Sequence, residues 1–139
     1  MREQLLIREL SKTFTLHLQG STRIPVMNGA SLAVMPGECV ALAGPSGAGK
    51  SSLLRMIYAN YRADGGSILV RGEGQVTDIV TADPRTIIAL RRETIGYVSQ
   101  FLSVIPRVSA VDIVAEPAIA QGRDADEATE AARELLARL

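Results

Sequence analysis

Residues 44–51, with the sequence GPSGAGKS, constrain the fold of this chain more than any other segment. They follow a short, wholly apolar run at residues 39–43 (CVALA), and the residues from Lys50 to about Tyr58 have the pattern of a helix. Short apolar runs are typical of strands that are buried on both faces, as in parallel sheets. The sequence therefore predicts a buried strand, a glycine-rich turn and a helix in direct succession.

The chemistry of this turn suits a phosphate group. Glycines allow backbone N–H groups to approach phosphate oxygens, and the start of a helix adds the positive end of its dipole. Gly44, Gly49, Lys50 and Ser51 meet the spacing G-x-x-x-x-G-K-[ST]. We expect Lys50 to bridge the β- and γ-phosphates of ATP and the Ser51 hydroxyl to bind Mg²⁺. The predicted contacts of this Walker A loop are Gly44, Pro45, Ser46, Gly47, Ala48, Gly49, Lys50, Ser51 and, at the α-phosphate, Ser52.

Composition narrows the setting in which such a loop would work. The chain has 139 residues, and its 15 Lys and Arg residues balance its 15 Asp and Glu residues. This balance argues against a sequence-independent nucleic-acid binder, which needs a positive excess. The single cysteine, Cys39, excludes an internal disulfide and fits a reducing compartment, and we expect it to be a small buried apolar residue. Without a signal-peptide pattern or an apolar stretch of membrane-spanning length, the sequence predicts a cytoplasmic protein.

The segments before the loop predict antiparallel strands, because apolar and polar residues alternate there. Their predicted bounds are 4–10, 12–18 and 30–34, with a loop at 19–23 and a turn at 35–38. After the loop, residues 67–71 and 76–80 flank a Gly-Glu-Gly-Gln sequence and predict a hairpin.

Further along, Asp83 followed by Pro84 predicts the start of a helix that ends near Arg92. Residues 95–99 (IGYVS) predict a strand. Ser109 with Asp112 resembles a capping box for a helix to about residue 120, distorted at Pro117. Asp124 predicts the start of a last helix with an apolar stripe.

Together these features resemble the ABC-type ATPases. The resemblance rests on the antiparallel segment before the loop, on Phe14 within LSKTF, and on a predicted strand that ends in Tyr97-Val98-Ser99-Gln100. It implies an α/β P-loop NTPase fold. It also implies that Phe14 stacks on the adenine ring and that Gln100, as the Q-loop residue, contacts Mg²⁺ and the attacking water. An ordinary core position for Phe14 and a solvated loop position for Gln100 are the competing interpretations.

Four segments sharpen the resemblance: RIPVMNGASL, MIYANY, VTDIVTADPRTIIALRRETIGYVSQ and FLSVIPRVSAVDIV. They are similar to the L component of the bacterial phosphonate C–P lyase system. That resemblance implies a role in phosphonate breakdown, with a second ABC subunit and the C–P lyase core subunits as partners. It covers essentially the whole chain.

The resemblance also implies a domain organisation in which residues 1–139 are part of one ABC nucleotide-binding domain. Residues 1–38 would be its antiparallel β part, 39–100 its core from the Walker A loop to the Q-loop, and 101–139 the start of its helical subdomain. No signature loop, Walker B carboxylates or switch histidine follow Gln100, and the only histidine is His17. We therefore expect a truncated chain that binds nucleotide without turnover. Because strands 39–43 and 95–99 would lack their shared neighbour, we expect it to be marginal or insoluble in isolation.

Three other functions remain open from the sequence. Lipoprotein-release and macrolide-type ABC exporters also have a PVMNG-like strand before the loop, and their ATPases couple to membrane-spanning subunits. Guanylate kinases have a loop very like PSGAGKSSL, although theirs lies close to the N-terminus. A non-catalytic nucleotide-binding module is the third.

Overall fold

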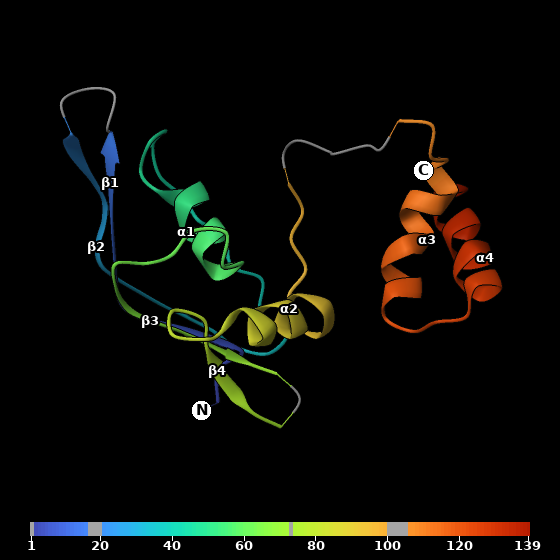
Figure 1. Ribbon diagram of the computed structural model, residues 1–139, viewed down its shortest axis with the longest axis horizontal. Helices are drawn as coiled ribbons and strands as arrows, with labels where there is room; N and C mark the ends of the chain where they lie inside the picture. The colour runs from blue at the N-terminus through green and yellow to red at the C-terminus, as the bar shows by residue number, and fades with distance from the viewer. Residues whose placement is uncertain (1, 17–20, 73, 100–105) are drawn as a thin grey trace. The chain divides into compact units, whose positions relative to one another are not determined.

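The computed structural model describes residues 2–16, 21–72, 74–99 and 106–139 (Figure 1). The chain forms two compact units, Met1–Gly96 and Tyr97–Leu139. The first contains a β-sheet and two helices, and the second is a pair of helices. Within the described residues, no helix is both long enough and apolar enough to cross a membrane.

The sheet of the first unit has four strands in the order β2-β1-β3-β4, and every neighbouring pair is antiparallel. The strands are β1 (Leu5–Leu16), β2 (Thr22–Val34), β3 (Gly65–Arg71) and β4 (Val76–Asp78). The predictions of an antiparallel opening segment and of a hairpin between β3 and β4 are confirmed.

β1 is one continuous strand with a register shift, whereas the sequence predicted two separate strands in this region. The pairing of β1 with both neighbours changes register beyond Ile7 and Arg8, and Glu9 has a φ of 47°. Gly66 on β3 packs closely against this irregularity. A Cβ built at Gly66 would lie only 2.4 Å from the Glu9 carbonyl oxygen. The predicted loop at 19–23 ends earlier than expected, since β2 already begins at Thr22.

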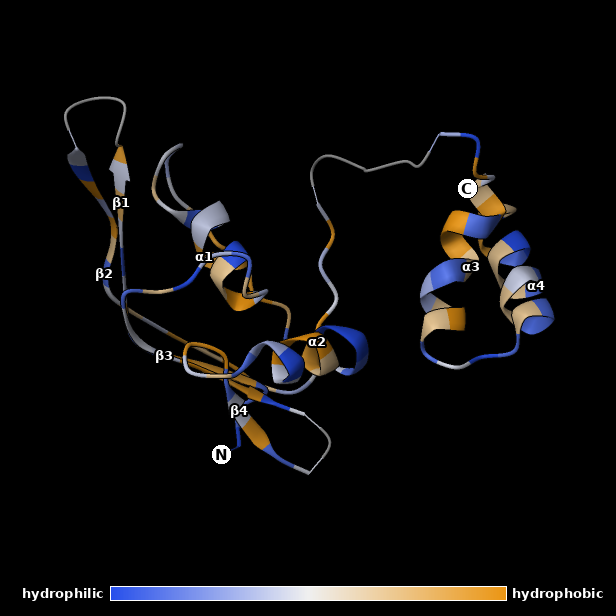
Figure 2. Cartoon of the chain, in the orientation of Figure 1, coloured by the Kyte–Doolittle hydropathy of each residue, from blue (hydrophilic) through white to orange (hydrophobic). Residues whose placement is uncertain are grey.

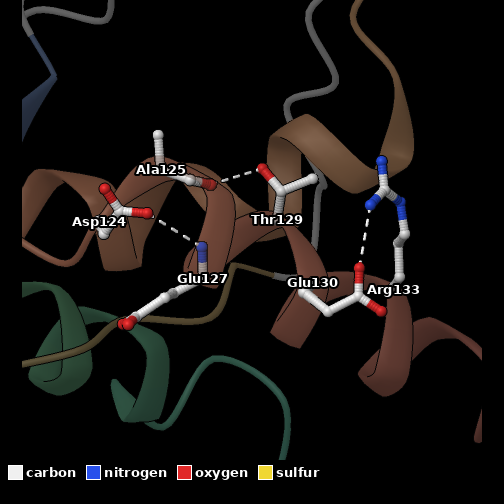
Figure 3. Close-up of polar contacts among 6 residues, drawn as sticks. All are labelled: Asp124, Ala125, Glu127, Thr129, Glu130 and Arg133. Carbon is white, nitrogen blue, oxygen red and sulfur yellow. Dashed lines mark hydrogen bonds and ion pairs between the residues drawn. The ribbon is translucent and has the colours of Figure 1, made fainter.

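The described residues form four helices in addition to the sheet, and the capping residues that the sequence predicted start three of them. These helices are α2 (Pro84–Glu93), α3 (Ala110–Ala120) and α4 (Ala125–Leu136), with Asp83, Ser109 and Asp124 as their N-caps; α3 continues through Pro117. The remaining helix is α1 (Lys50–Ile57). Figure 3 shows the start of α4, where Asp124 accepts a hydrogen bond from the Glu127 amide at 3.2 Å.

Each unit has its own core. In the first, side chains from β1, α1, β3 and α2 pack together, and the largest fully buried ones are Ile7, Leu10, Met56 and Ile68. In the second, the buried core residues within 97–99 and 106–139 are Ala115 of α3 with Ala128 and Ala132 of α4. Polar and apolar residues alternate around both of these helices, as Figure 2 shows.

Two predicted strands are absent from the structure. Residues 39–43 and 95–99 have no strand structure, and no described residue forms a ladder with them. A buried parallel strand requires partners on both sides to satisfy its backbone groups, and the described sheet is purely antiparallel. As a result Cys39 is exposed, which contradicts its predicted burial, and Val98 is 91% exposed.

Candidate functional site

The glycine-rich loop joins residues 39–43 to α1 through a tight backbone path. Gly44, Gly47 and Gly49 all have positive φ values, of 142°, 82° and 86°. Gly49 is also the N-cap of α1, and a Cβ at this position would be 2.9 Å from the carbonyl oxygen of Val26. Only glycine fits here, because both the backbone conformation and the close approach to β2 exclude a side chain.

The start of α1 is open to an anion. Among the described residues no side chain caps α1, and its first turn contains no acidic residue. The first intrahelical bond joins the Leu53 amide to the Gly49 carbonyl at 2.8 Å. The amides of Lys50, Ser51 and Ser52 precede that bond, so they lack intrahelical acceptors and carry the positive end of the helix dipole. This arrangement favours a phosphate group.

The Lys50 side chain folds back over the loop. Its ammonium group donates hydrogen bonds to the carbonyl oxygens of Gly44 at 2.8 Å and Pro45 at 2.7 Å. Pro45 also accepts from the Ala48 amide at 3.3 Å, which closes the turn. These hydrogen bonds hold the only cationic side chain of residues 44–51 against the carbonyl groups at the start of the loop.

A cavity of about 440 Å³ connects this loop to β1 and β2. Its polar end is formed by the loop and the first turn of α1, and its other end by apolar strand residues. It is lined by Phe14, Leu16, Ile24, Val26, Ser46, Gly47, Gly49, Lys50, Ser51 and Ser52. Phe14, predicted to stack on the adenine ring, thus shares one cavity with the predicted phosphate contacts.

Several residues around the cavity were not predicted. Phe14 is directly opposite Ile24 in the β1–β2 register, which explains how Ile24 and Val26 line the cavity beside it. The two-residue spacing of Ile24 and Val26 was a signal for a shared strand face. Tyr61 also contacts Phe14, with ring centroids 5.3 Å apart, and no sequence pattern connected these two residues.

An ion pair secures β1 next to Phe14. Lys12 donates to the Asp64 carboxylate at 2.8 Å, and the Thr13 amide donates to the same carboxylate at 2.7 Å. The Lys12 hydrogen bond, followed by that of Thr13, lowers the pKa of Asp64 below its ordinary value. The Lys12 ammonium also lies 5.4 Å from the centroid of the Phe14 ring.

The predicted Mg²⁺ ligands are only partly placed. Ser51 lines the cavity, whereas Gln100 lies outside the described residues. The described residues contain no group of three or more His, Cys, Asp or Glu side chains that could hold a metal ion by themselves. The Ser51 hydroxyl is therefore the one predicted Mg²⁺ ligand that the described residues place in this cavity.

Comparison with known proteins identifies the family. The model of the ABC transporter family matches residues 27–139. The lipoprotein-releasing system ATP-binding protein LolD of Maricaulis maris is 38% identical over 96% of this chain and 56% of its own length. The macrolide export ATP-binding/permease protein MacB of Sodalis glossinidius is 36% identical over 94% of this chain and 19% of its own length.

A solved structure agrees with these relatives. The dimeric ATP-binding cassette MJ0796, in a post-hydrolysis state bound to ADP and Pi, matches with a TM-score of 0.80 and 26% identity. The match covers 94% of this chain and 54% of that one. The chain thus spans about half the length of the lipoprotein-releasing relatives and of this structure.

These findings favour one of the predicted functions over the others. They support the predicted exporter-type relatives and do not support the assignment to the phosphonate C–P lyase system. They also set aside the guanylate kinase alternative, because the family model covers most of the chain. The fold is that of an ABC ATPase with a P-loop, and the chain belongs to the ABC transporter family.

Proposed function

We propose that this chain is the ATP-binding part of an ABC exporter of the lipoprotein-release or macrolide type. The single observation that carries nucleotide binding is the cavity that joins Phe14 to the glycine-rich loop. The exporter class is supported by the names of the relatives, LolD and MacB. The partners in this proposal are a second ATP-binding subunit and membrane-spanning subunits, which places the chain on the cytoplasmic side of the membrane.

In this proposal, different residues of the cavity contact different parts of the nucleotide. Lys50 and the amides at the start of α1 contact the β- and γ-phosphates, and Ser52 contacts the α-phosphate. Ser51 holds Mg²⁺, whose positive charge offsets that of the phosphates. Phe14 offers its ring to the base, beside Leu16, Ile24 and Val26. Each assignment uses the chemistry that its side chain brings to the cavity.

Binding, rather than turnover, is the activity that we assign to these residues. ATP hydrolysis is the activity of the family. This reaction requires a group that orients the attacking water. None of the described residues that line the cavity is a carboxylate. In this proposal, the contacts of Phe14 and the loop account for affinity, and the catalytic step depends on groups beyond this cavity.

The Lys50→Ala variant tests nucleotide binding. We expect its affinity for Mg-ATP and for Mg-tripolyphosphate to fall roughly 10- to 100-fold, because hydrogen bonds to charged groups contribute that much. Isothermal titration calorimetry measures both affinities. Arg92→Ala is the matched control, since it removes an exposed cation from α2 of the same unit. Equal affinities in wild type and Lys50→Ala would contradict the proposal.

A role in the phosphonate C–P lyase system is the second candidate, and it rests on the four segments that resemble the L component of that system. Two of the segments that carry that resemblance meet in the structure through Arg91. Its guanidinium donates to the Tyr58 carbonyl at 3.0 Å and to the Asn60 side chain at 3.1 Å, and it covers the Tyr58 ring at 4.6 Å. The comparisons favour the exporter class, so this candidate rests on the segments alone.

Affinity capture discriminates the two candidates. Tagged chain is incubated in parallel with purified C–P lyase core subunits and with detergent-solubilised membrane subunits of a lipoprotein-releasing or macrolide exporter. Retention of the membrane subunits supports the first proposal, and retention of the lyase core supports the second.

A further inference from the structure

The Phe14 ring is held by residues that lie outside the predicted nucleotide site. Tyr61 meets it edge to face, with an interplanar angle of 75°. Arg55 holds Tyr61 in turn, because its guanidinium donates to the Tyr61 hydroxyl at 2.6 Å and lies 5.3 Å from the centroid of that ring. Edge-to-face pairs prefer a defined orientation, so this contact selects among the possible orientations of Phe14.

We propose that Tyr61 is a positioning residue for the nucleotide base, which holds the Phe14 ring with its face toward the cavity, and that Arg55 fixes Tyr61. This inference rests on the proposed function, because it assumes that Phe14 contacts a base. It adds a specific role for two residues that do not line the cavity.

The connection between the phosphate loop and Phe14 runs through α1. This helix begins at Lys50, beside the loop, and Arg55 lies in its last turn. Beyond its end, the Tyr61 and Asn60 amides donate to the Arg55 carbonyl oxygen at 3.2 Å and 2.7 Å. The segment after Tyr61 is hydrogen-bonded to β1, because the Asp64 amide donates to the Ser11 carbonyl oxygen at 2.9 Å.

This arrangement sets the separation between the two ends of the cavity. One rigid helix links the amides that face phosphate to the tyrosine that orients Phe14. A nucleotide has a fixed span from base to phosphates, so the ring must be at the correct separation and angle before binding. A ring that is already oriented loses less conformational freedom when the base arrives, which raises affinity without any new contact.

Two ligands separate this role from a general contribution to folding. Mg-ATP contains both a base and phosphates, whereas Mg-tripolyphosphate contains only phosphates. If Tyr61 acts through Phe14, its removal weakens binding of the first ligand and leaves the second unchanged. If Tyr61 only stabilises the fold, both ligands lose affinity together.

The experiment measures both affinities by calorimetry on the full chain and its variants. Tyr61→Leu should weaken Mg-ATP binding roughly five- to tenfold and change Mg-tripolyphosphate binding by less than about twofold. Tyr61→Phe retains the ring and should recover most of the Mg-ATP affinity. Tyr58→Leu is the matched control, because it removes the other tyrosine near the end of α1, whose ring faces Arg91 instead of Phe14.

A double variant and an optical signal complete the test. In a Phe14→Leu background, Tyr61→Leu should have no further effect on Mg-ATP affinity, because the two residues act as one unit. The triphosphate of 2-aminopurine riboside should be quenched by wild type at saturation and less quenched by Tyr61→Leu. Equal losses for both ligands, no loss for either, or additive losses in the double variant would each overturn the inference.

The failure of the proposed function would look different. If Lys50→Ala bound Mg-tripolyphosphate as tightly as wild type, the loop would not be the phosphate site, and this inference would fall with it. If Lys50→Ala lost that binding while Tyr61→Leu bound Mg-ATP normally, only the role of Tyr61 would be wrong.

Discussion

Gly49 determines where the glycine-rich loop ends and α1 begins. Its φ of 86° is unfavourable for any residue with a Cβ, and the carbonyl oxygen of Val26 blocks that position at 2.9 Å. We predict that Gly49→Ala lowers the free energy of unfolding by about 1–3 kcal/mol, measured by urea denaturation.

The Gly37→Ala variant separates the two causes of this loss. Gly37 has a φ of 75°, yet nothing lies within 4 Å of a Cβ built there. This variant should lose only the backbone contribution, about 1 kcal/mol. If both variants lost the same free energy, the close approach of Val26 would not matter.

Asp64 gives the first unit a dependence on pH. Its pKa is lowered in the folded chain, chiefly by the hydrogen bond from Lys12, from an ordinary value of 3.8. The ionised form therefore stabilises the fold fully above that value, and the contribution is lost as pH falls through the lower, folded pKa. We predict that the stability difference between wild type and Asp64→Asn shrinks below about pH 4.

Urea midpoints of the two proteins, measured from about pH 7 down to about pH 3, test this expectation. Other carboxylates titrate in the same range, so only the difference between the two proteins is informative. The Asp64 side chain is 48% exposed, which means that solvent screens the pair and the effect is small. A difference that stays constant with pH would show that the Asp64 charge has no role.

At the residue scale, the sequence predicted those site residues that a local motif marks. Lys50 and Ser51 follow from the motif, and the structure places both in one cavity with Phe14. Tyr61 was not predicted, because its contact with Phe14 arises only when the chain beyond α1 packs against β1. No local pattern marks two aromatic residues that meet through tertiary structure.

Among the helices, capping residues were the most dependable local signal. Ser109 accepts from the Asp112 amide at 3.1 Å and donates its hydroxyl to the Asp112 carboxylate at 2.6 Å, which confirms Ser109 as the N-cap of α3. We predict that Ser109→Ala destabilises the second unit by about 1 kcal/mol, because α3 loses this partner. Urea denaturation followed by circular dichroism measures the loss. Ser109→Thr retains the hydroxyl and should be close to wild type.

The strands were harder to predict, for a physical reason. A helix satisfies its backbone within one segment, whereas a strand requires a partner from elsewhere in the chain. Residues 39–43 have the apolar composition of a buried strand, yet none of the described residues pairs with them. In contrast, β3 and β4 were predicted correctly because a short turn supplies each with its partner.

For the whole molecule, the two units differ in how much apolar surface they bury. The first unit encloses large side chains such as Ile7, Leu10 and Met56, while the buried residues in the described part of the second are three alanines. An alanine buries only a methyl group, so each contributes much less to stability than an isoleucine or methionine. Regions with few buried apolar contacts open at a lower free energy.

Hydrogen–deuterium exchange tests this difference directly. We predict that amides in α3 and α4 exchange faster than those in β1 and β3, since the small core of the second unit allows it to open more often. Met56→Ala creates a cavity that should cost the first unit about 2–5 kcal/mol. Because Met56 belongs only to the core of the first unit, the substitution should accelerate exchange in β1 and β3 and leave α3 and α4 unchanged. Faster exchange in all four elements would mean that the two units unfold together, and that their separate cores do not make them independent.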